Sequence, residues 1–305
     1  MFTVAIAGGS GFIGQHLAAK LTQHNFQVRI LSRKAKQQNP FPTFVVDYQD
    51  ISSLTQALQG IDYLVNLTGC LFSFTAEGYF NGTVLPTCSL IQAANKTPTL
   101  KRFIHISSQA AAGPAPTKQP IDESFPCNPV ADYGRTKLAA EKELSHLKTP
   151  FVILRPPIVY GPNASGLSDL APFLKYGFFI DPTPTVLYSV IHVEDLTNAI
   201  VIAIQKAEVL NQTFFVADQN AYTWKQLIQA VANRNVRFLN INPRLAGAAI
   251  RLYQFLAKPL NGPALLNYDK INEMNITGHW LCSNQKWVKI TGQSFRSLPS
   301  TSSKS

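Results

Sequence analysis

The chain opens on Val4-Ala5-Ile6-Ala7-Gly8-Gly9-Ser10-Gly11-Phe12-Ile13-Gly14, which joins a short apolar run to a turn containing four glycines. The apolar run covers residues 3–7 and is typical of a strand buried on both faces of a parallel sheet. A helical pattern with Leu17 and Leu21 follows the turn and ends near Asn25. Because a helix N-terminus attracts anions, strand, turn and helix in this order predict a phosphate-binding turn.

The spacing of the glycines gives each of them a role in such a turn. Gly8 permits the tight turn, Gly11 lets the backbone approach a pyrophosphate, and Gly14 lets the helix pack on the sheet. A glycine triplet alone is weak evidence, but here a strand precedes it and a helix follows. We therefore expect dinucleotide binding rather than a glycine turn without a ligand. The cofactor-binding residues expected from this turn are Gly8, Ser10, Gly11, Phe12, Ile13 and Gly14.

Strand and helix patterns alternate along the first half of the chain. Further strands are predicted at residues 27–31, 44–46, 63–67, 102–106 and 151–154, with helices at 51–58, 83–94 and about 133–147. Alternation with short links predicts an α/β fold, a Rossmann-type doubly wound parallel sheet. We assign residues 1–162 to this dinucleotide-binding core.

The alternation loosens after residue 162. Residues 163–298 are predicted to be a mixed region that partly completes the core and partly forms a smaller substrate-binding cap, and residues 299–305 a frayed tail. Expected elements here are strands at 190–193 and 213–216, helices at 196–205 and from an N-cap at Thr223, and a basic amphipathic helix at 244–258.

Composition narrows the class of protein. The chain has 305 residues, 46% of them hydrophobic and 14% charged, so it can bury a large core. Its net charge of +10 comes from dispersed Lys and Arg without a recognition motif, so we expect no nucleic-acid partner. The four cysteines are scattered, which favours a reducing, cytoplasmic location and no metal site. The sequence contains no run of about 18 apolar residues, so we expect no membrane span. We expect a monomer or homodimer that acts on a small-molecule substrate.

Tyr133 and Lys137 are four residues apart in a helical pattern, which places both on one face. A neighbouring cation is expected to lower the tyrosine pKa from roughly 10, which would suit it to acid/base work. Ser108 follows the strand at 102–106, at the sheet edge where ligands bind. The predicted catalytic group is Ser108, Tyr133 and Lys137: Ser108 hydrogen-bonds a substrate oxygen, Tyr133 moves its proton, and Lys137 holds the nicotinamide ribose.

Residues Ser32-Arg33-Lys34 end the second predicted strand. A cofactor without a 2′-phosphate would favour a carboxylate there, whereas a hydroxyl and two cations suit a 2′-phosphate. NADP(H) is therefore favoured over NAD(H), with Ser32 and Arg33 as contacts. Asp47, after the third strand, is expected near the adenine amino group. The alternative is that Arg33 and Lys34 are ordinary surface cations and Asp47 an ordinary loop carboxylate, with no ligand bound to them.

Taken together, these motifs resemble the extended short-chain dehydrogenase/reductases of the NAD-dependent epimerase/dehydratase type, over most of residues 1–220. The matching segments are residues 8–14, 47–48, 105–108, 133–141, 154–162 and 191–196. The resemblance implies Ser108, Tyr133 and Lys137 as the catalytic group. It also implies that the segment from Pro156 contacts the nicotinamide side and that residues beyond 162 close over substrate. Tyr48, Thr68 and Pro156, with Tyr133 and Lys137, complete the expected cofactor site.

The chain also departs from the family pattern. Asn66-Leu67-Thr68-Gly69 stands where sugar-nucleotide enzymes frequently have His-Leu-Ala-Ala, and Ala112 stands where they often have Tyr. Thr83 and Pro86 are expected in the first turn of their helix. These departures resemble the atypical reductase-like members more than sugar-nucleotide epimerases.

Two functions remain open at this point. One is an NAD(P)-dependent oxidoreductase, or epimerase/dehydratase-like enzyme, that moves a hydride between nicotinamide and a substrate carbinol or carbonyl, with Tyr133 as acid/base. The other is a non-catalytic NADP(H)-binding structural or regulatory subunit. Aromatic residues of the expected cap slightly favour an apolar or mixed substrate over a sugar nucleotide, namely Phe173, Tyr176, Phe178, Phe179 and Tyr188.

Overall fold

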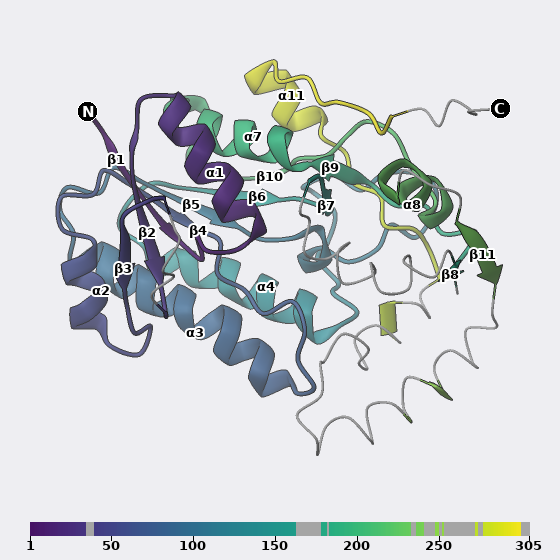
Figure 1. Cartoon of the computed structure of the whole chain (residues 1–305), viewed down its shortest axis with the longest axis horizontal. Coiled ribbons are helices and arrows are strands. Elements are labelled where there is room, and N and C mark those ends of the chain that lie inside the picture. Colours follow the sequence, from purple (N-terminus) through teal and green to yellow (C-terminus); the bar gives the residue numbers. More distant parts are fainter. Residues whose placement is uncertain are drawn as a thin grey trace.

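A seven-stranded parallel sheet forms the centre of the molecule (Figure 1). The computed structural model describes residues 1–34, 40–162, 178–181, 183–232, 236–240, 248–249, 252, 272–273 and 277–299. The strands are β1 (Thr3–Ala7), β2 (Gln27–Ser32), β3 (Thr43–Val45), β4 (Tyr63–Asn66), β5 (Arg102–Ile106), β6 (Phe151–Arg155) and β10 (Gln212–Phe215). Their order across the sheet is β10-β6-β5-β4-β1-β2-β3.

The strand order reverses beside β1. This strand pairs with β2 on one side, where Ile6 faces Ile30, and with β4 on the other, where Ile6 faces Val65. In open α/β sheets, ligands bind outside the carboxyl ends of the strands at such a reversal. The turn after β1 and the segment after β4 therefore border the expected ligand crevice.

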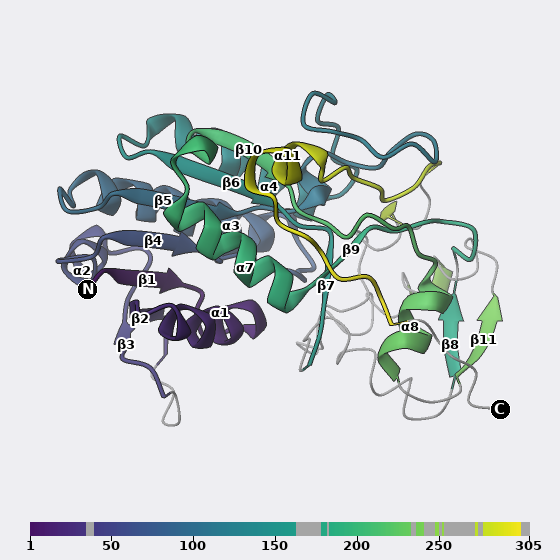
Figure 2. The same cartoon turned by 90° about the horizontal axis from the view of Figure 1, so that it is seen from above.

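Helices cover both faces of the sheet, as a doubly wound fold requires (Figures 1 and 2). On one face lie α1 (Phe12–Gln23), α7 (Val193–Gln205) and α11 (Gln285–Thr291), and on the other α2 (Ile51–Ala57), α3 (Ala76–Asn95) and α4 (Asp132–Glu143). Leu17, Leu196 and Trp287 are fully buried in the first layer. Leu54 and Leu90 are fully buried in the second. The predicted fold class is thus confirmed.

Smaller elements lie beyond the carboxyl edge. Strand β7 (Ile158–Tyr160) pairs with β9 (Val190–His192), and β8 (Phe178–Asp181) pairs with β11 (Arg237–Asn240) near α8 (Trp224–Ala232) (Figure 1). Of the short 3₁₀ helices, η1 (Gln109–Ala111) follows β5, whereas η2 (Leu144–His146) precedes β6 and η3 (Ala207–Val209) precedes β10. Single bridges join the C-terminal segment to earlier parts of the chain, namely Ala115 to His279, Ile121 to Cys282 and Tyr188 to Trp280.

Most predicted elements are found, and one helix needs a correction. Helix α3 begins at Ala76, well before the predicted start, and the Thr75 side chain caps it by accepting a hydrogen bond from the Gly78 N–H at 3.1 Å. Pro86 therefore lies inside the helix and not in its first turn. A proline inside a helix removes one backbone hydrogen bond, and Pro86 is itself buried. The predicted cap at Thr223 is confirmed by a 3.3 Å bond from the Gln226 N–H.

Some predictions fall on other parts of the chain. Phe173 and Tyr176 lie outside the described residues, as does nearly all of the predicted helix at 244–258. Within the ranges that the structure describes, no helix is both long and apolar enough to span a membrane. The strands β7, β8 and β11 and the helix α11 are additions that the sequence patterns did not indicate.

Candidate active site

The glycine turn after β1 requires glycine at two positions for steric reasons. Gly8 has a φ of +78°, and a Cβ there would lie 3.0 Å from the backbone of Leu67. A Cβ on Gly14 would lie only 2.4 Å from the Cα of Gly9, so α1 could not pack as it does. The Gly11 N–H donates to the Gly8 carbonyl at 3.1 Å and closes the turn.

Helix α1 presents its N-terminus to the crevice without a side-chain cap. Gly11 is the N-cap residue, it has no side chain to accept the first N–H groups, and the first turn contains no acidic residue. The first N–H groups of a helix lack partners inside it and carry partial positive charge. The turn is therefore a cradle that fits the pyrophosphate of a dinucleotide.

The two glycines Gly11 and Gly14 allow a contrast between folding and binding. For Gly14→Ala we expect a loss of about 1–3 kcal/mol in the free energy of unfolding, because the new methyl group overlaps backbone. For Gly11→Ala the new Cβ would lie 3.4 Å from its nearest neighbour, the Gly8 carbonyl oxygen. This variant should keep wild-type stability and lose about 10-fold or more in dinucleotide affinity. Urea unfolding and cofactor fluorescence measure the two effects, and equal stability losses in both variants would contradict this account.

The segments after β2 and β3 approach the same turn. The Ser32 hydroxyl donates to the Lys34 carbonyl at 2.9 Å, and Arg33 is exposed. Burial raises the pKa of Tyr48 to about 12, while a hydrogen bond with the Gly8 backbone and the charge of Arg33 act against the rise. Arg33 thus lies close enough to the glycine turn to act on its neighbours. Asp47 is exposed and accepts a 2.9 Å bond from the Gln49 N–H.

Ser108 and Tyr133 come together where η1 meets α4. The Ser108 hydroxyl accepts a hydrogen bond from the Ala110 N–H at 3.1 Å and is also hydrogen-bonded to Tyr133. A Cβ on Gly134 would lie 2.3 Å from the Ala110 carbonyl oxygen, so only glycine lets α4 come this close to η1. Gly134 is therefore the reason that the two hydroxyl groups can meet.

Lys137 is buried beneath the segment that follows β4. Its ammonium donates to the Thr68 carbonyl at 3.2 Å and to the Ile106 carbonyl at 3.0 Å, and only 4% of the residue is exposed. A Cβ on Gly69 would lie 2.8 Å from this nitrogen. Burial lowers the pKa of Lys137 to about 8, and the charge of Glu141 opposes that change.

One predicted property of Tyr133 is wrong. We expected Lys137 to lower the tyrosine pKa, but burial raises the pKa of Tyr133 to about 12, against the opposing hydrogen bond of Ser108. Electrostatic interactions with Glu273 and Cys70 raise the pKa of Tyr133 further. The two bonds of the Lys137 ammonium described above go to main-chain carbonyls and not to the phenol. Tyr133 is thus a neutral phenol near pH 7, suited to donate a proton.

A buried ionic network behind Lys137 escaped the sequence reasoning. Arg155 binds Glu141 through two nitrogens, at 2.9 and 2.6 Å, and the Ser107 hydroxyl donates to the same carboxylate. These three residues are at most 8% exposed. The signal that could have found Glu141 is its position four residues after Lys137, on the same face of α4. The network ties α4 to the ends of β5 and β6.

The remaining residues that were predicted to bind the cofactor lie in different surroundings. The buried Pro156 accepts a 2.9 Å bond from the Gln109 N–H, which joins the end of β6 to the segment of Ser108. Thr68 lies beside the glycine turn, because a Cβ on Gly8 would be 3.2 Å from its nitrogen. The side chains of Phe12 and Ile13 pack against two hydrophobic clusters. The carbonyl of Ser10 accepts a bond from the side chain of Gln15 at 3.3 Å.

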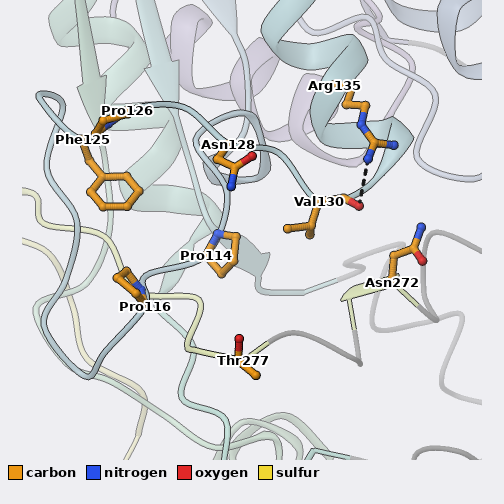
Figure 3. Close-up of a pocket in the computed structure, with 9 residues that line it drawn as sticks. All are labelled: Pro114, Pro116, Phe125, Pro126, Asn128, Val130, Arg135, Asn272 and Thr277. Carbon is orange, nitrogen blue, oxygen red and sulfur yellow. Dashed lines mark hydrogen bonds between the residues drawn. The ribbon is translucent and has the colours of Figure 1, made fainter.

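A cavity of about 690 Å³ lies beside the start of α4 (Figure 3). Its lining residues are Pro114, Pro116, Phe125, Pro126, Asn128, Val130, Arg135, Asn272 and Thr277. In Figure 3 the Arg135 guanidinium is hydrogen-bonded to the Val130 carbonyl, at 3.5 Å. Cavities of this size hold small molecules.

The fold and the cradle define a dinucleotide-binding enzyme of the short-chain dehydrogenase/reductase type. A model of the NAD dependent epimerase/dehydratase family matches residues 4–217, and the chain belongs to that family. Membership of this family supports NAD-dependent oxidoreductase or epimerase chemistry.

Relatives with known names differ in what they act on. A dTDP-6-deoxy-L-talose 4-dehydrogenase (NAD(P)(+)) from Kitasatospora kifunensis is 34% identical over 45% of each chain, so the match spans less than half of that protein. A ceramide reductase from Caulobacter vibrioides is 26% identical over 89% of this chain and 83% of its own. The UDP-glucose 4-epimerase of Thermus thermophilus, solved with NAD, superposes with a TM-score of 0.73 at 18% identity, covering 94% of this chain and 92% of that one.

Proposed function

We propose that the chain is an NADP(H)-preferring oxidoreductase in which Ser108, Tyr133 and Lys137 form the catalytic group. The observation that carries this proposal is the hydrogen bond between Ser108 and Tyr133 at the carboxyl edge of the sheet. Lys137 is on the same helix and is held between the ends of β4 and β5. Family membership supports the reaction class, and the glycine cradle supports the cofactor.

Each residue has a distinct task in this proposal. When bound, a nicotinamide cofactor would supply or accept the hydride. Ser108 and Tyr133 hold the substrate oxygen, and Tyr133 gives it a proton as a carbonyl is reduced. An ammonium has three N–H donors, and two main-chain carbonyls take two of those on Lys137. The third would be available to the ribose hydroxyls of a bound cofactor and would help to hold that cofactor beside Tyr133.

Arg33 is proposed to select the phosphorylated cofactor. Its charge reaches Tyr48 beside the glycine turn, where an adenosine ribose would bind. For Arg33→Ser we expect the preference for NADPH over NADH to fall by about 10-fold or more, because a hydrogen bond to a charged group is lost. Lys142→Ser, on the exposed side of α4, removes the same charge and should leave the preference unchanged. An unchanged ratio of the two dissociation constants in Arg33→Ser would refute this role.

A hydrophobic ketone or alcohol is the proposed substrate class. A relative that matches 89% of the chain is named a ceramide reductase, and that name supports a lipid-like substrate. The segment after β4 also presents apolar side chains: Leu71 is 51% exposed, and Phe72 and Phe74 are half-buried. The sugar-nucleotide relatives make the competing class.

Turnover assays decide between these classes. Purified protein with NADPH is tested on long-chain ketones and on sugar nucleotides of the dTDP and UDP series. We expect the long-chain ketones to be reduced and the sugar nucleotides to remain unchanged. Tight NADPH binding without turnover on either panel would favour a non-catalytic, cofactor-binding subunit instead.

A cytoplasmic location is also a proposal, and the four free thiols support it. The domain boundary between residues 162 and 163 is a further proposal.

A further inference from the structure

The buried side chain of Asn66, at the end of β4, uses its full hydrogen-bonding capacity. Its amide nitrogen donates to the Thr87 hydroxyl at 3.0 Å and lies 3.2 Å from Nδ1 of His105. Its amide oxygen accepts from the Thr68 N–H at 2.9 Å and from the Thr68 hydroxyl at 2.6 Å. A side-chain amide has two donors and two acceptor sites, so every one of them is engaged.

The Asn66 amide fixes the segment that holds Lys137. Thr68 is bound at both its N–H and its hydroxyl, and its carbonyl is one of the two acceptors of the Lys137 ammonium. The next residue, Gly69, lies against that ammonium. On α3, the Cys70 N–H donates to the Thr83 hydroxyl at 3.1 Å, and the Thr87 hydroxyl donates to the Thr83 carbonyl at 2.8 Å.

His105 makes the arrangement specific for an amide. Burial and the charge of Lys137 lower the pKa of His105 to about 3, so its ring is neutral near pH 7. Nδ1 can then accept the Asn66 N–H, and the ring proton is on Nε2. An aspartate at position 66 would lack the donors for His105 and Thr87, and a leucine would lack both donors and acceptors.

We propose that Asn66 is a positioning residue that holds the Thr68 carbonyl where it receives the Lys137 ammonium. This rests on the proposed function, in which Lys137 binds the cofactor ribose. Asn66 touches neither cofactor nor substrate and acts through Thr68. Removing the amide frees Thr68 to turn its carbonyl away. The ammonium then loses a fixed acceptor, and its third N–H loses its direction.

Other titratable groups also lie around Lys137. Glu141 and Tyr133 face it from its own helix, His105 from β5, and Cys70 lies near Tyr133 after β4. Arg155, from β6, is paired to Glu141. His105 is bonded to the Asn66 amide nitrogen, so Thr68→Val, which keeps Asn66 and its contact with His105, shows whether a change in the titration of Lys137 comes from Thr68.

The test measures the titration of Lys137 in the cofactor-free protein. Competitive acylation from about pH 6 to about pH 10, read by peptide mass spectrometry, gives its apparent pKa in each variant. For Asn66→Leu we expect a fall of about one pH unit, because a hydrogen bond to a charged group is lost. For Thr87→Val, which cuts the other end of the same buried amide, we expect lower thermal stability and an unchanged Lys137 titration. Thr68→Val is the replacement variant if Asn66→Leu does not fold. It should also lower the apparent pKa of Lys137, but by less than Asn66→Leu does.

NADPH binding measured on the same proteins separates the two proposals. If Asn66 positions Lys137, Asn66→Leu weakens NADPH binding about 10-fold near pH 7 and Thr87→Val does not. An unshifted titration in both Asn66→Leu and Thr68→Val, or an equal shift in Thr87→Val, overturns the positioning role. If the Lys137 titration shifts in Asn66→Leu but the wild-type protein does not bind NADPH, Asn66 remains the positioning residue and the proposed function is refuted.

Discussion

Replacing Tyr133 with phenylalanine is expected to lower turnover by about 100-fold to 10,000-fold, the usual contribution of a positioned proton donor. The ring stays and only the hydroxyl is lost, so cofactor affinity should remain close to wild type. Steady-state kinetics and NADPH titration measure the two quantities. Activity within a few-fold of wild type would remove Tyr133 from the reaction.

Tyr79 provides a matched control for this substitution. Its ring centroid lies 6.4 Å from that of Tyr133, and the residue is 2% exposed on α3. Tyr79→Phe makes the same chemical change next to the site and should retain most of the turnover. If both variants lose activity equally, the loss reflects removal of a buried hydroxyl from this pair of residues and not proton transfer by Tyr133.

The pH dependence follows from the direction of the tyrosine shift. Because the pKa of Tyr133 is raised to about 12, its proton is present below that pH and is lost above it. Reduction should therefore not decline through tyrosine ionisation between about pH 6 and pH 9. Any decline near pH 8 should belong to Lys137, whose pKa is lowered to about 8. Lys137→Met should abolish that step in a pH–rate profile.

The largest stability effect is expected for the buried pair of Arg155 and Glu141. Arg155→Met leaves the Glu141 carboxylate buried with only hydroxyl support from Ser107, and breaking such a pair costs about 3–5 kcal/mol in the free energy of unfolding. The double variant Arg155→Met with Glu141→Leu removes both charges and should recover most of that loss. Urea unfolding of the three proteins gives the coupling between the two positions.

An exposed pair on the same helix is the control for this cycle. Arg135 and Asp132 lie 2.9 Å apart with side chains 56% and 37% exposed, so Arg135→Met should change stability by about 1 kcal/mol or less. The double variant at Arg155 and Glu141 should also lower the pKa of Lys137, because the Glu141 charge that raises it is gone. An Arg155→Met variant as stable as Arg135→Met would contradict the assigned role of the buried pair.

Local sequence patterns were enough to predict the central fold. Residues 3–7 become β1, the glycine turn opens α1, and the strand predicted at 102–106 matches β5. These elements have strong periods and glycine or polar boundaries, which local patterns report well. The short strands β7, β8 and β11 could not be predicted in this way, since such brief strands depend on partners far away in the chain.

Sequence patterns predicted that some residues of the candidate site lie close together, but they did not predict its electrostatics. Spacing on one helix placed Tyr133 and Lys137 together, but it could not show that Lys137 binds the carbonyls of Thr68 and Ile106. Burial, which depends on the whole fold, then reversed the expected shift of the Tyr133 pKa. Arg155 and Glu141 were missed as partners for the same reason, because their contact joins β6 to α4.

Transfer of a label from cofactor to product tests the central claim most directly. The protein is incubated with NADPH that carries deuterium at nicotinamide C4 and with the substrate panel, and products are analysed by mass spectrometry. We predict one deuterium on the new carbinol carbon of a reduced hydrophobic ketone, and labelling that is slower by about 100-fold or more with Tyr133→Phe. Tight NADPH binding without any labelled product, or equal labelling by Tyr133→Phe, would contradict the account.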